Sequence, residues 1–326
     1  MRAAYLAAPG RLEVGEFEVP QPEPGQALVR MHHASICGSD VHVVFHGFHH
    51  EHALGRPGYP GHDGVGEVVE TRSPEVAPGQ LVLTAPLVHV AACFAEYQAV
   101  PGASLVLLPA GGDPARLLFA QQLGTTIYAV RRFWPGPEPG RAAAVLGAGS
   151  AGLFFLQQLL QLGFETVVVS DLDPHRLEVA RELGAHAVVR APEESIVDAT
   201  MDLSGGQGAD LVVEAAGYDV CRAQAVAAVR YRGRIGCFGF PERRGDALFP
   251  TDVAFRKSPT IEFSGGTQSE PGLRSFRDAV AAIHEGRIQV DYCLEPRLPL
   301  SRAPEALGLA RDRGPGAVKV GLDPGA

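Results

Sequence analysis

Hydrophobic and polar positions follow two different patterns along the chain. In the first hundred residues, short apolar or alternating runs, such as 27–31, 66–70 and 81–83, are separated by Gly and Pro. Short strands at this spacing predict a compact β-rich domain. After Pro114, apolar runs alternate with amphipathic segments. That alternation is typical of a parallel sheet covered by helices on both faces.

Individual elements can be predicted from these patterns. Strands are predicted at 142–146, 166–170, 187–190, 211–214 and 235–238, and helices at 115–133, 151–162, 174–183 and 221–229. From about residue 260 the pattern is mixed again, with a predicted helix at 272–285 and a final strand at 317–322. The predicted fold class is therefore α/β, a β-rich domain followed by a doubly wound parallel sheet.

Composition narrows the class of protein. The 326 residues suffice for about two domains. A formal net charge of −9 argues against nucleic acid as a partner, because phosphate binding needs a basic surface.

The most apolar stretch, 142–163, is interrupted by glutamines and glycines, and the amino terminus soon becomes polar. Neither a membrane span nor a signal peptide is predicted. Five scattered cysteines without a CxxC pair favour a reduced, cytoplasmic protein.

One glycine-rich motif lies between a predicted strand and a predicted helix. Gly147-Ala-Gly-Ser-Ala-Gly152 has the GxGxxG form. Gly147 permits the tight turn, Gly149 lets the backbone approach a pyrophosphate, and Gly152 lets the helix pack on the strand. Ser150 and Ala151 begin the helix, whose free N–H groups and dipole attract phosphate. The motif therefore predicts a dinucleotide site in preference to a glycine turn without a ligand.

The cofactor is predicted to be NAD(H). Asp171 ends the second strand, 19 residues after Gly152. A carboxylate there accepts hydrogen bonds from both ribose hydroxyls of the adenosine and repels a 2′-phosphate. Asp173 is interpreted as the N-cap of the helix that Pro174 begins.

Two short motifs in the first domain suggest a metal site. The first is Cys37-Gly-Ser-Asp-Val-His42, and the second is Gly61-His-Asp-Gly-Val-Gly66. A cysteine thiolate and a histidine imidazole are usual zinc ligands. Two such residues alone do not define a site, because isolated Cys and His side chains are more often structural.

These motifs, with GAGSAG and the tail Pro299-Leu-Ser-Arg-Ala-Pro-Glu-Ala-Leu307, resemble the zinc-dependent medium-chain dehydrogenases of the alcohol dehydrogenase superfamily. The sorbitol and polyol branch is the most similar, and the resemblance spans nearly the whole chain. It implies a chaperonin-10-like catalytic domain at 1–122, a Rossmann dinucleotide-binding domain at 123–263, and a segment at 264–326 that returns to the catalytic domain. It also implies a homodimer in which the nucleotide-domain sheets join edge to edge, to which a strand near 260–263 could contribute.

The resemblance assigns roles to residues of the two short motifs. Cys37 and His62 match two ligands of a catalytic zinc, and Asp40 matches the carboxylate that orients His62. Ser39 matches the hydroxyl that takes the substrate proton. His42 matches the histidine that passes this proton to solvent by way of the cofactor ribose.

Two positions near the predicted metal differ from the family pattern. Asp63 replaces the family's glutamate beside the metal and is shorter. Counting back from the arginine pair at 131–132 places Gln121 at the third ligand position, where the family has glutamate or cysteine. A neutral amide is a weaker ligand and does not offset the charge of the metal. Three interpretations stay open: zinc bound with Gln121 at reduced affinity, a histidine from elsewhere as the substitute, or loss of the metal.

A histidine-rich stretch supplies candidates for such a substitute. Eight of the twelve histidines lie between His32 and His62, and 45–52 is the richest part. A solvent-facing loop with incidental histidines is the preferred interpretation over a second metal site. A histidine in this loop could also serve substrate binding.

Other positions complete the comparison with the family. Members with a structural zinc carry four close-set cysteines, whereas the matching segment here has Cys93 alone. No structural zinc is therefore predicted, and Cys93 is interpreted as a packing residue.

The resemblance also concerns residues near the cofactor. Lys319 matches a basic residue that reaches the cofactor pyrophosphate, and a lysine on the protein surface is the equal alternative. Ala216 and Gly239 follow strand ends and are predicted to lie near the nicotinamide.

The resemblance also implies an activity. It predicts a zinc-dependent oxidoreductase that transfers a hydride between NAD(H) and a small-molecule secondary alcohol or ketone, such as a polyol, sugar or cyclitol. Zinc polarises the substrate oxygen in such enzymes, and the cofactor carries the hydride chemistry. Two alternatives are a zinc-free medium-chain reductase of the quinone or enoyl type and a non-catalytic NAD(H)-binding sensor.

Overall fold

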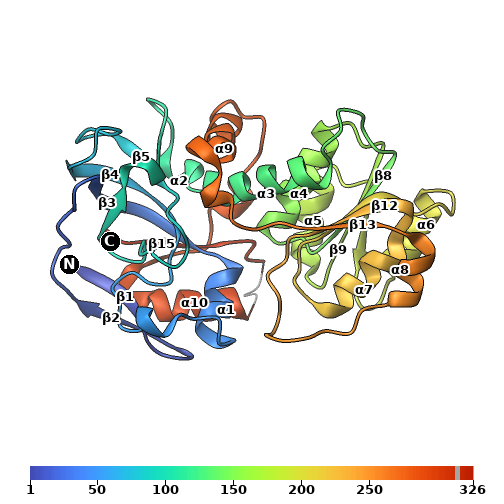
Figure 1. Ribbon diagram of the computed structural model, residues 1–326, viewed down its shortest axis with the longest axis horizontal. Coiled ribbons are helices and arrows are strands. Elements are labelled where there is room, and N and C mark those ends of the chain that lie inside the picture. The colour runs from blue at the N-terminus through green and yellow to red at the C-terminus, as the bar shows by residue number, and fades with distance from the viewer. Residues whose placement is uncertain (313–315, 326) are drawn as a thin grey trace. The chain divides into compact units, whose positions relative to one another are not determined.

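The computed structural model describes residues 1–312 and 316–325, and its elements are labelled in Figure 1. The chain divides into two compact units, Met1–Thr125 with Gly266–Ala326, and Thr126–Gly265. The sequence predicts the corresponding boundaries after residues 122 and 263. The second unit thus interrupts the first, whose two segments share one sheet.

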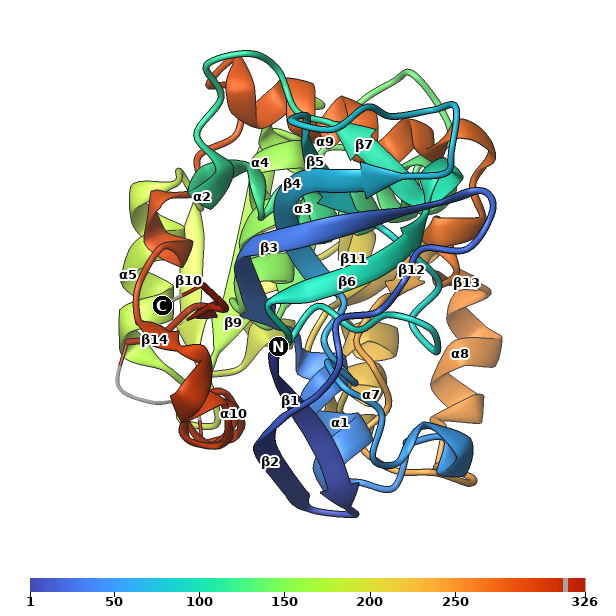
Figure 2. The same ribbon diagram turned by 90° about the vertical axis from the view of Figure 1, so that its left-hand side faces the viewer.

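The first unit contains a large, mainly antiparallel sheet. Its described strands follow the order β14-β15-β3-β4-β5-β7, β6 pairs with β3 outside this row, and β1 and β2 form a separate hairpin. Figure 2 shows β3 between β4 and β6. The strands are β1 (Arg2–Ala8), β2 (Arg11–Glu16), β3 (Gln26–Ile36), β4 (Asp63–Thr71), β5 (Leu81–Thr84), β6 (Tyr97–Pro101), β7 (Leu105–Leu107), β14 (Arg297–Pro299) and β15 (Val320–Asp323).

Helices cover parts of this sheet. They are α1 (Gly38–Phe45), α2 (Pro114–Leu117), α3 (Ala120–Phe133), which continues into the second unit, α9 (Arg274–His284) and α10 (Ala303–Arg311). A 3₁₀ turn, η1 (Glu51–Ala53), follows α1. The core beneath them includes Met31, Tyr59 and Phe94, which are at most 1% exposed.

The single helix predicted over 115–133 is wrong, because a short break separates α2 from α3. Residues 117–120 are each at most 2% exposed. Four consecutive side chains cannot share one helical face. The backbone therefore tightens at this point, where the N–H groups of Phe119 and Gln121 donate to carbonyls three residues earlier.

Three strand ends of the first unit meet at one place. β3 and β4 are antiparallel, with Ser35 opposite Asp63. β15 also pairs antiparallel with β3, with Val320 opposite Ile36. Because β3 ends at Ile36, Cys37 leaves the sheet beside the first residue of β4 and the first residue of β15. This register makes neighbours of residues that are far apart in sequence.

The second unit is built on a parallel sheet. Its strands follow the order β10-β9-β8-β11-β12-β13, and each neighbouring pair is parallel. They are β8 (Ala142–Leu146), β9 (Thr166–Asp171), β10 (Ala187–Arg190), β11 (Ala209–Glu214), β12 (Val229–Cys237) and β13 (Thr260–Phe263). The strand order reverses between β8 and β11, and in such sheets ligands bind outside the carboxyl ends of the strands at this reversal.

Helices connect the strands of the second unit. They are α4 (Ser150–Gln161), α5 (Pro174–Glu182), α6 (Ile196–Leu203), α7 (Asp219–Ala228) and α8 (Thr251–Lys257). The predicted α/β class and doubly wound sheet are confirmed. The sequence did not predict α6 or α8. Within the described residues, none of the helices combines the length and the apolar character needed to cross a membrane.

Candidate functional site

Cys37 is held at the start of α1 by its own motif. It precedes the helix in an extended conformation, and its backbone N–H donates to Asp40 Oδ2 at 2.8 Å. The carboxylate thereby satisfies an N–H group that a helix start leaves free. Asp40 is fully buried, and its other oxygen lies 2.9 Å from His62 Nδ1. One carboxylate thus fixes both the Cys37 backbone and the His62 ring.

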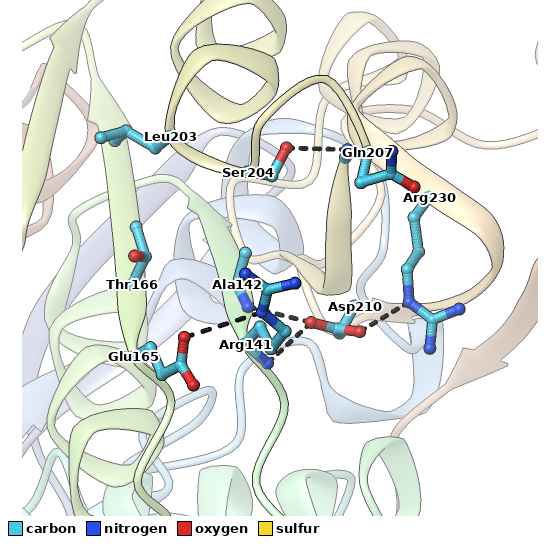
Figure 3. A pocket seen from close by; sticks show the side chains of 10 residues that line it. Arg141, Ala142, Glu165, Thr166, Leu203, Ser204, Gln207, Asp210 and Arg230 are labelled. Carbon is cyan, nitrogen blue, oxygen red and sulfur yellow. Dashed lines mark hydrogen bonds and ion pairs between the residues drawn. The ribbon is translucent and has the colours of Figure 1, made fainter.

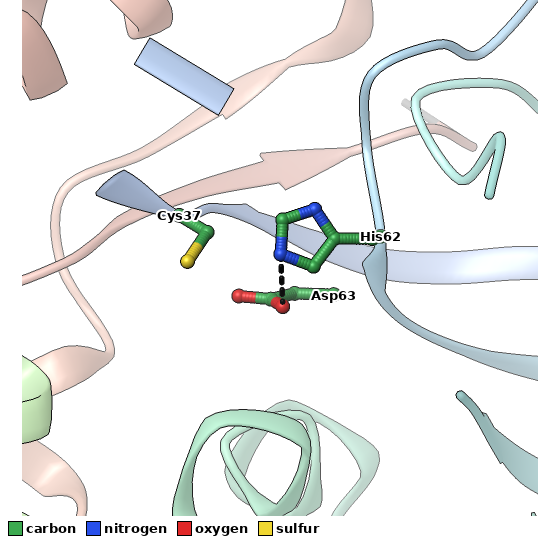
Figure 4. Close-up of side chains that lie close together, drawn as sticks. All are labelled: Cys37, His62 and Asp63. Atoms are coloured by element: carbon green, nitrogen blue, oxygen red, sulfur yellow. Dashed lines mark ion pairs between the residues drawn. The ribbon is translucent and has the colours of Figure 1, made fainter. Parts of the chain in front are cut away.

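Cys37, His62 and Asp63 form a compact group of metal-ligating side chains. One donor atom of each lies within 4.8 Å of the others, and Figure 4 shows the three side chains facing one another. His62 and Asp63 are buried, and Cys37 is partly buried. His62 Nε2 lies 3.4 Å from Asp63 Oδ1 and 3.3 Å from Ser39 Oγ. The serine hydroxyl of the first motif therefore lies beside this group.

Lys319 adds a positive charge to the same place. It immediately precedes β15, and its ammonium donates to Asp63 Oδ2 at 2.8 Å and to Gln122 Oε1 at 3.3 Å. Lys319 is only 5% exposed. The sequence assigned it to the cofactor pyrophosphate, with a surface position as the alternative. The surface alternative is wrong, because the pairing of β15 with β3 buries this ammonium against Asp63, and the contact with the cofactor stays a prediction.

The charges of this group shift several pKa values. Burial by itself raises the pKa of the Cys37 thiol, but the charges of Lys319 and His62 reverse that effect and lower it. Burial also raises the pKa of Asp63, and Lys319 and His62 again lower it below its usual value. For His62, burial lowers the pKa, whereas Asp40 and Asp63 raise it well above the usual value. Cys37 and Asp63 are thus favoured in the ionised forms that bind metals.

A divalent metal ion fits the residues that are present. With Cys37 and Asp63 ionised and Lys319 protonated, the group carries one excess negative charge, apart from the adjacent pair of Asp40 and His62. Buried charge is costly unless it is paired or coordinates a metal. Asp63 Oδ1 is also buried without a hydrogen-bond partner among the described residues. Thiolate, imidazole and carboxylate are all zinc ligands, so the donor set suits zinc.

The glycine-rich turn of the second unit has the geometry that the motif predicts. Gly147 has φ of 101°, which favours glycine. A Cβ atom on Gly152 would lie 1.8 Å from the Gly147 carbonyl oxygen, so helix and turn approach too closely for any side chain. Gly149 is the N-cap of α4, and Ser150 and Ala151 are its first, buried residues.

Asp171 lies beside this turn at the end of β9. Its carboxylate accepts hydrogen bonds from Ala148 N at 2.6 Å and from Asp173 N at 2.9 Å. Asp173 caps α5 by accepting from His175 N, as the sequence predicts. The carboxylate of Asp171 is thereby held in one orientation at the carboxyl end of the sheet.

The ends of β11 and β12 are joined tightly at the same edge of the sheet. Glu214 accepts hydrogen bonds from Ala216 N at 2.8 Å and Gly217 N at 2.6 Å. A Cβ atom on Gly239 would lie 2.1 Å from Gly217 N. The backbones around Ala216 and Gly239 therefore lie in close contact, next to the place where the strand order of the sheet reverses.

Two family models match the chain. The model described as the alcohol dehydrogenase GroES-like domain matches residues 23–110, and the one described as zinc-binding dehydrogenase matches residues 151–285. The chain belongs to the zinc-type medium-chain dehydrogenases. The GroES-like, or chaperonin-10-like, domain and the Rossmann-type sheet implied by the resemblance are therefore confirmed.

Relatives of this dehydrogenase are enzymes of the same kind. L-threonine 3-dehydrogenase of Bacillus velezensis is 26% identical over 91% of each chain. Sorbitol dehydrogenase of Bacillus subtilis is 23% identical over 81% of each chain. The solved structure of an alcohol dehydrogenase from Thermus sp. ATN1 has a TM-score of 0.83 and 28% identity, covering 99% of each chain. At the level of the family, the dehydrogenase is an alcohol dehydrogenase-type enzyme that uses NAD(P).

Gln121, the predicted third ligand of this dehydrogenase, is 2% exposed near the start of α3. Its Nε2 has no hydrogen-bond partner in the part of the chain that the structure describes. The next residue, Gln122, instead contacts the charged group through Lys319. Sequence reasoning missed Gln122, because only the burial of Lys319 brings the two side chains together.

Two further predicted residues of the dehydrogenase lie in the first unit. Cys93 is fully buried, in line with a packing role, and its thiol donates to the Asp63 carbonyl at 3.3 Å. His42 lies in α1, where its ring centroid is 4.8 Å from that of His46 and 5.9 Å from that of Phe48. The five cysteines are all free thiols.

A cavity of ≈ 230 Å³ lies at the opposite, amino-terminal edge of the parallel sheet (Figure 3). Asp210 lines this cavity. Its carboxylate accepts hydrogen bonds from Arg141 N at 2.8 Å, Ala142 N at 2.9 Å and Arg230 Nε at 2.6 Å. None of the predicted site residues lines it. Since dinucleotides bind at the carboxyl ends of such strands, this cavity is not the cofactor crevice of the dehydrogenase.

Proposed function

We propose that this dehydrogenase transfers a hydride between NAD(H) and a secondary alcohol or its ketone, with polyols, sugars or cyclitols as the substrate class. The observation that supports this most directly is the group formed by Cys37, His62 and Asp63, with the hydroxyl of Ser39 beside it. The name of the sorbitol dehydrogenase relative supports the substrate class.

Each residue of the group has a separate role in this proposal. Cys37, His62 and Asp63 hold the metal, and Lys319 keeps Asp63 ionised through their 2.8 Å ion pair. When bound, zinc supplies Lewis-acid polarisation of the substrate oxygen. Asp40 Oδ1, 2.9 Å from His62 Nδ1, orients the ring, which leaves Nε2 to donate its lone pair to the metal. In this assignment Asp63, rather than Gln121, is the third protein ligand.

A proton must leave the alcohol when it is oxidised. Ser39 would accept this proton at its hydroxyl oxygen while giving up its own proton toward the cofactor ribose, and His42 would pass that proton on to solvent. The position of Ser39 Oγ, 3.3 Å from His62 Nε2, supports the first part of this relay. General acid–base transfer of this kind contributes roughly 10²–10⁴-fold to rates.

Asp171 supports NAD(H) as the cofactor in preference to NADP(H). Two backbone N–H groups already orient its carboxylate, so remaining lone pairs can accept hydrogen bonds from ribose hydroxyls. A 2′-phosphate placed against this carboxylate would be repelled.

The test combines metal analysis with cofactor and substrate specificity. Purified protein is expected to hold one zinc per chain at the group of Cys37, His62 and Asp63, and to oxidise secondary polyols with NAD⁺ at least tenfold more efficiently than with NADP⁺. Replacement of Ser39 by Ala should lower kcat while leaving the zinc content and NADH affinity unchanged. Zinc-free protein that reduces quinones or enoyl compounds would support the reductase alternative. NADH binding without turnover of any alcohol or ketone would support the sensor alternative.

A homodimer is part of the same proposal. β13 is an edge strand of the parallel sheet, and Phe263 at its end is 67% exposed. A cytoplasmic location is proposed from the composition and from the five free thiols.

A further inference from the structure

The histidine-rich loop gathers imidazoles from two separate segments. The ring centroids of His50 and His52 are 5.4 Å apart, and those of His50 and His89 are 6.1 Å apart. All three residues are exposed. His89 lies 37 positions beyond His52 in the sequence, so only the fold brings its ring near that of His50.

The backbone on the His50 side is anchored to the core. His50 directly precedes η1, and its carbonyl accepts from Ala53 N at 2.9 Å. Its N–H donates to the hydroxyl of Tyr59 at 3.3 Å, and Tyr59 is only 1% exposed. His52 lies within the same 3₁₀ turn. The two histidines therefore stand on one short, well-supported turn.

The backbone on the His89 side is tied to the same support. Arg56 donates to the carbonyl of His89 at 2.9 Å and to that of Ala91 at 2.8 Å. Its guanidinium lies over the ring of Tyr59, 4.9 Å from the centroid. Tyr59 and Arg56 thus hold both segments, which keeps the three rings near one another without any ligand.

Two ring spacings, both from His50, are close to the spacing that one shared metal ion requires. A histidine nitrogen binds zinc at ~2.1 Å, which places each ring centroid about 3.2 Å from the metal and two centroids about 5.2 Å apart in a tetrahedral site. The His50–His52 spacing is close to this value, and the His50–His89 spacing exceeds it by less than 1 Å. The exposed side chains must rotate about their own bonds to direct one nitrogen each at the same ion, because among the described residues the donor atoms of Cys37, His62 and Asp63 alone already lie within 4.8 Å of one another.

We propose that His50, His52 and His89 form a second metal site of the dehydrogenase, which takes a late first-row divalent cation such as Zn²⁺. Three neutral imidazoles without a carboxylate favour such ions over Mg²⁺ or Ca²⁺. Solvent completes the coordination, because the three side chains are exposed. The bound ion links the η1 turn to the segment around His89. This site shares no ligand with the group around Cys37, so it does not rest on the proposed activity.

Co²⁺ titration can separate the two sites. A cobalt ion bound to the Cys37 thiolate gives a charge-transfer absorption that an all-histidine site lacks. Wild-type protein, stripped of metal, is expected to bind two Co²⁺ per chain, of which only one contributes this absorption. The double variant H52Q/H89Q should bind one Co²⁺ per chain with the thiolate absorption unchanged. The variant C37S should keep one Co²⁺ and lose the absorption.

A matched control is the double variant H175Q/H284Q, which also removes two exposed histidines and should still bind two Co²⁺. Calorimetric titration with Zn²⁺ should give the same stoichiometries, with affinity for the second ion at least tenfold weaker in H52Q/H89Q. The proposal is overturned if H52Q/H89Q binds as many ions as the control variant, or if wild-type protein binds one ion alone and that ion carries the thiolate absorption. If cobalt-loaded wild-type protein shows no thiolate absorption, that result would contradict the proposed catalytic site instead.

Discussion

Lys319 and Asp63 form an ion pair whose side chains are 3% and 1% exposed. Removing two charges from water is costly, and the attraction between them only partly offsets this. The pair is therefore better explained by its effect on the ionisation of the Cys37 thiol and the Asp63 carboxyl than by a contribution to folding stability. Lys319 lowers the pKa values of both Cys37 and Asp63 despite their burial, which keeps two ligands ionised.

The first prediction concerns this pair. Replacing Asp63 by Asn leaves the buried ammonium of Lys319 without a counter-charge, so we expect a loss of about 3–5 kcal/mol in the free energy of unfolding. The double variant D63N/K319M should recover a large part of that loss while still failing to retain zinc. Urea unfolding and metal analysis measure the two effects separately. Equal stability of D63N and wild-type protein would contradict this account.

A second residue-scale prediction concerns Asp210 and pH. Burial by itself raises the pKa of Asp210, but two backbone N–H groups and Arg230 lower it below the usual value. A carboxyl whose pKa is lowered by folding adds stability above its unfolded pKa of about 3.9, and this stability is lost as pH falls through the folded pKa. We expect D210N to be about 1–3 kcal/mol less stable at pH 7, with the difference shrinking below pH ~4.

Urea unfolding at pH 7 and at several acidic pH values checks this dependence. Arg141→Gln is a suitable control, because Asp210 bonds only to the backbone of Arg141 and not to its side chain. A difference between D210N and wild type that stays constant across the acidic range would contradict the role of the charge.

At the scale of elements, the turn between β8 and α4 shows that glycines in one motif serve different purposes. A Cβ atom on Gly149 would meet nothing closer than Arg176 at 4.0 Å, and its φ of −66° suits any residue. Gly152 has no such freedom, because its Cβ would clash with the Gly147 carbonyl. Gly152 is needed by the fold, whereas Gly149 is needed only by a ligand that approaches the backbone.

This contrast gives the third prediction. G149A should keep the stability of wild-type protein to within about 0.5 kcal/mol and bind NADH at least tenfold more weakly. G152A should lose about 1–3 kcal/mol, because the helix must shift away from the turn. Thermal unfolding and NADH fluorescence titration measure the two properties. Normal NADH affinity in G149A would argue against the proposed pyrophosphate position.

At the scale of the whole molecule, one edge of the parallel sheet is the proposed dimer contact. Among the described strands, β13 is paired on one side only, and unpaired edge strands are prone to pair with another chain. Phe263 on this strand and Phe255 on α8 are 67% and 83% exposed. Exposed aromatic side chains beside an open edge are typical of an interaction surface.

The fourth prediction tests this edge as the dimer interface. Phe263→Glu should convert a dimer into a monomer, because charge would be buried in the interface and repel its symmetry-related copy. Leu203→Glu, at a side chain of comparable type that is 46% exposed on α6, should leave the dimer intact. Sedimentation equilibrium gives the mass of each variant. A wild-type monomer, or an F263E dimer, would contradict the proposal.

Much of the second unit could be predicted because its signals are local. The strands at 142–146 and 187–190 have the predicted bounds, since continuous apolar runs between turns report buried parallel strands directly. The Asp173 cap was also predictable, because a cap bonds to residues two or three positions away. α6 and α8 were missed, and α8 has no buried residue to give it an apolar face.

The candidate metal group was only partly predictable. The two motifs and the family resemblance identified Cys37 and His62 as ligands and placed Asp63 beside the metal, but they left the third ligand open between Gln121, a histidine from elsewhere and loss of the metal. The burial of Lys319 against Asp63 was not predicted, because its neighbours are set by the pairing of β15 with β3. Such pairing joins residues across most of the chain and leaves no mark on the sequence around Lys319.

The sequence by itself determined what depends on near neighbours: the α/β class, the parallel strands, the glycine turn with its acidic partner at Asp171, and the membership of a dehydrogenase family. The tertiary structure alone decided which distant side chains share a site. It buried Lys319 against Asp63 and brought the ring of His89 near that of His50. The physical reason is that strand register and buried support, here Tyr59 and Arg56, are properties of long-range packing, which periodicity along a chain does not encode.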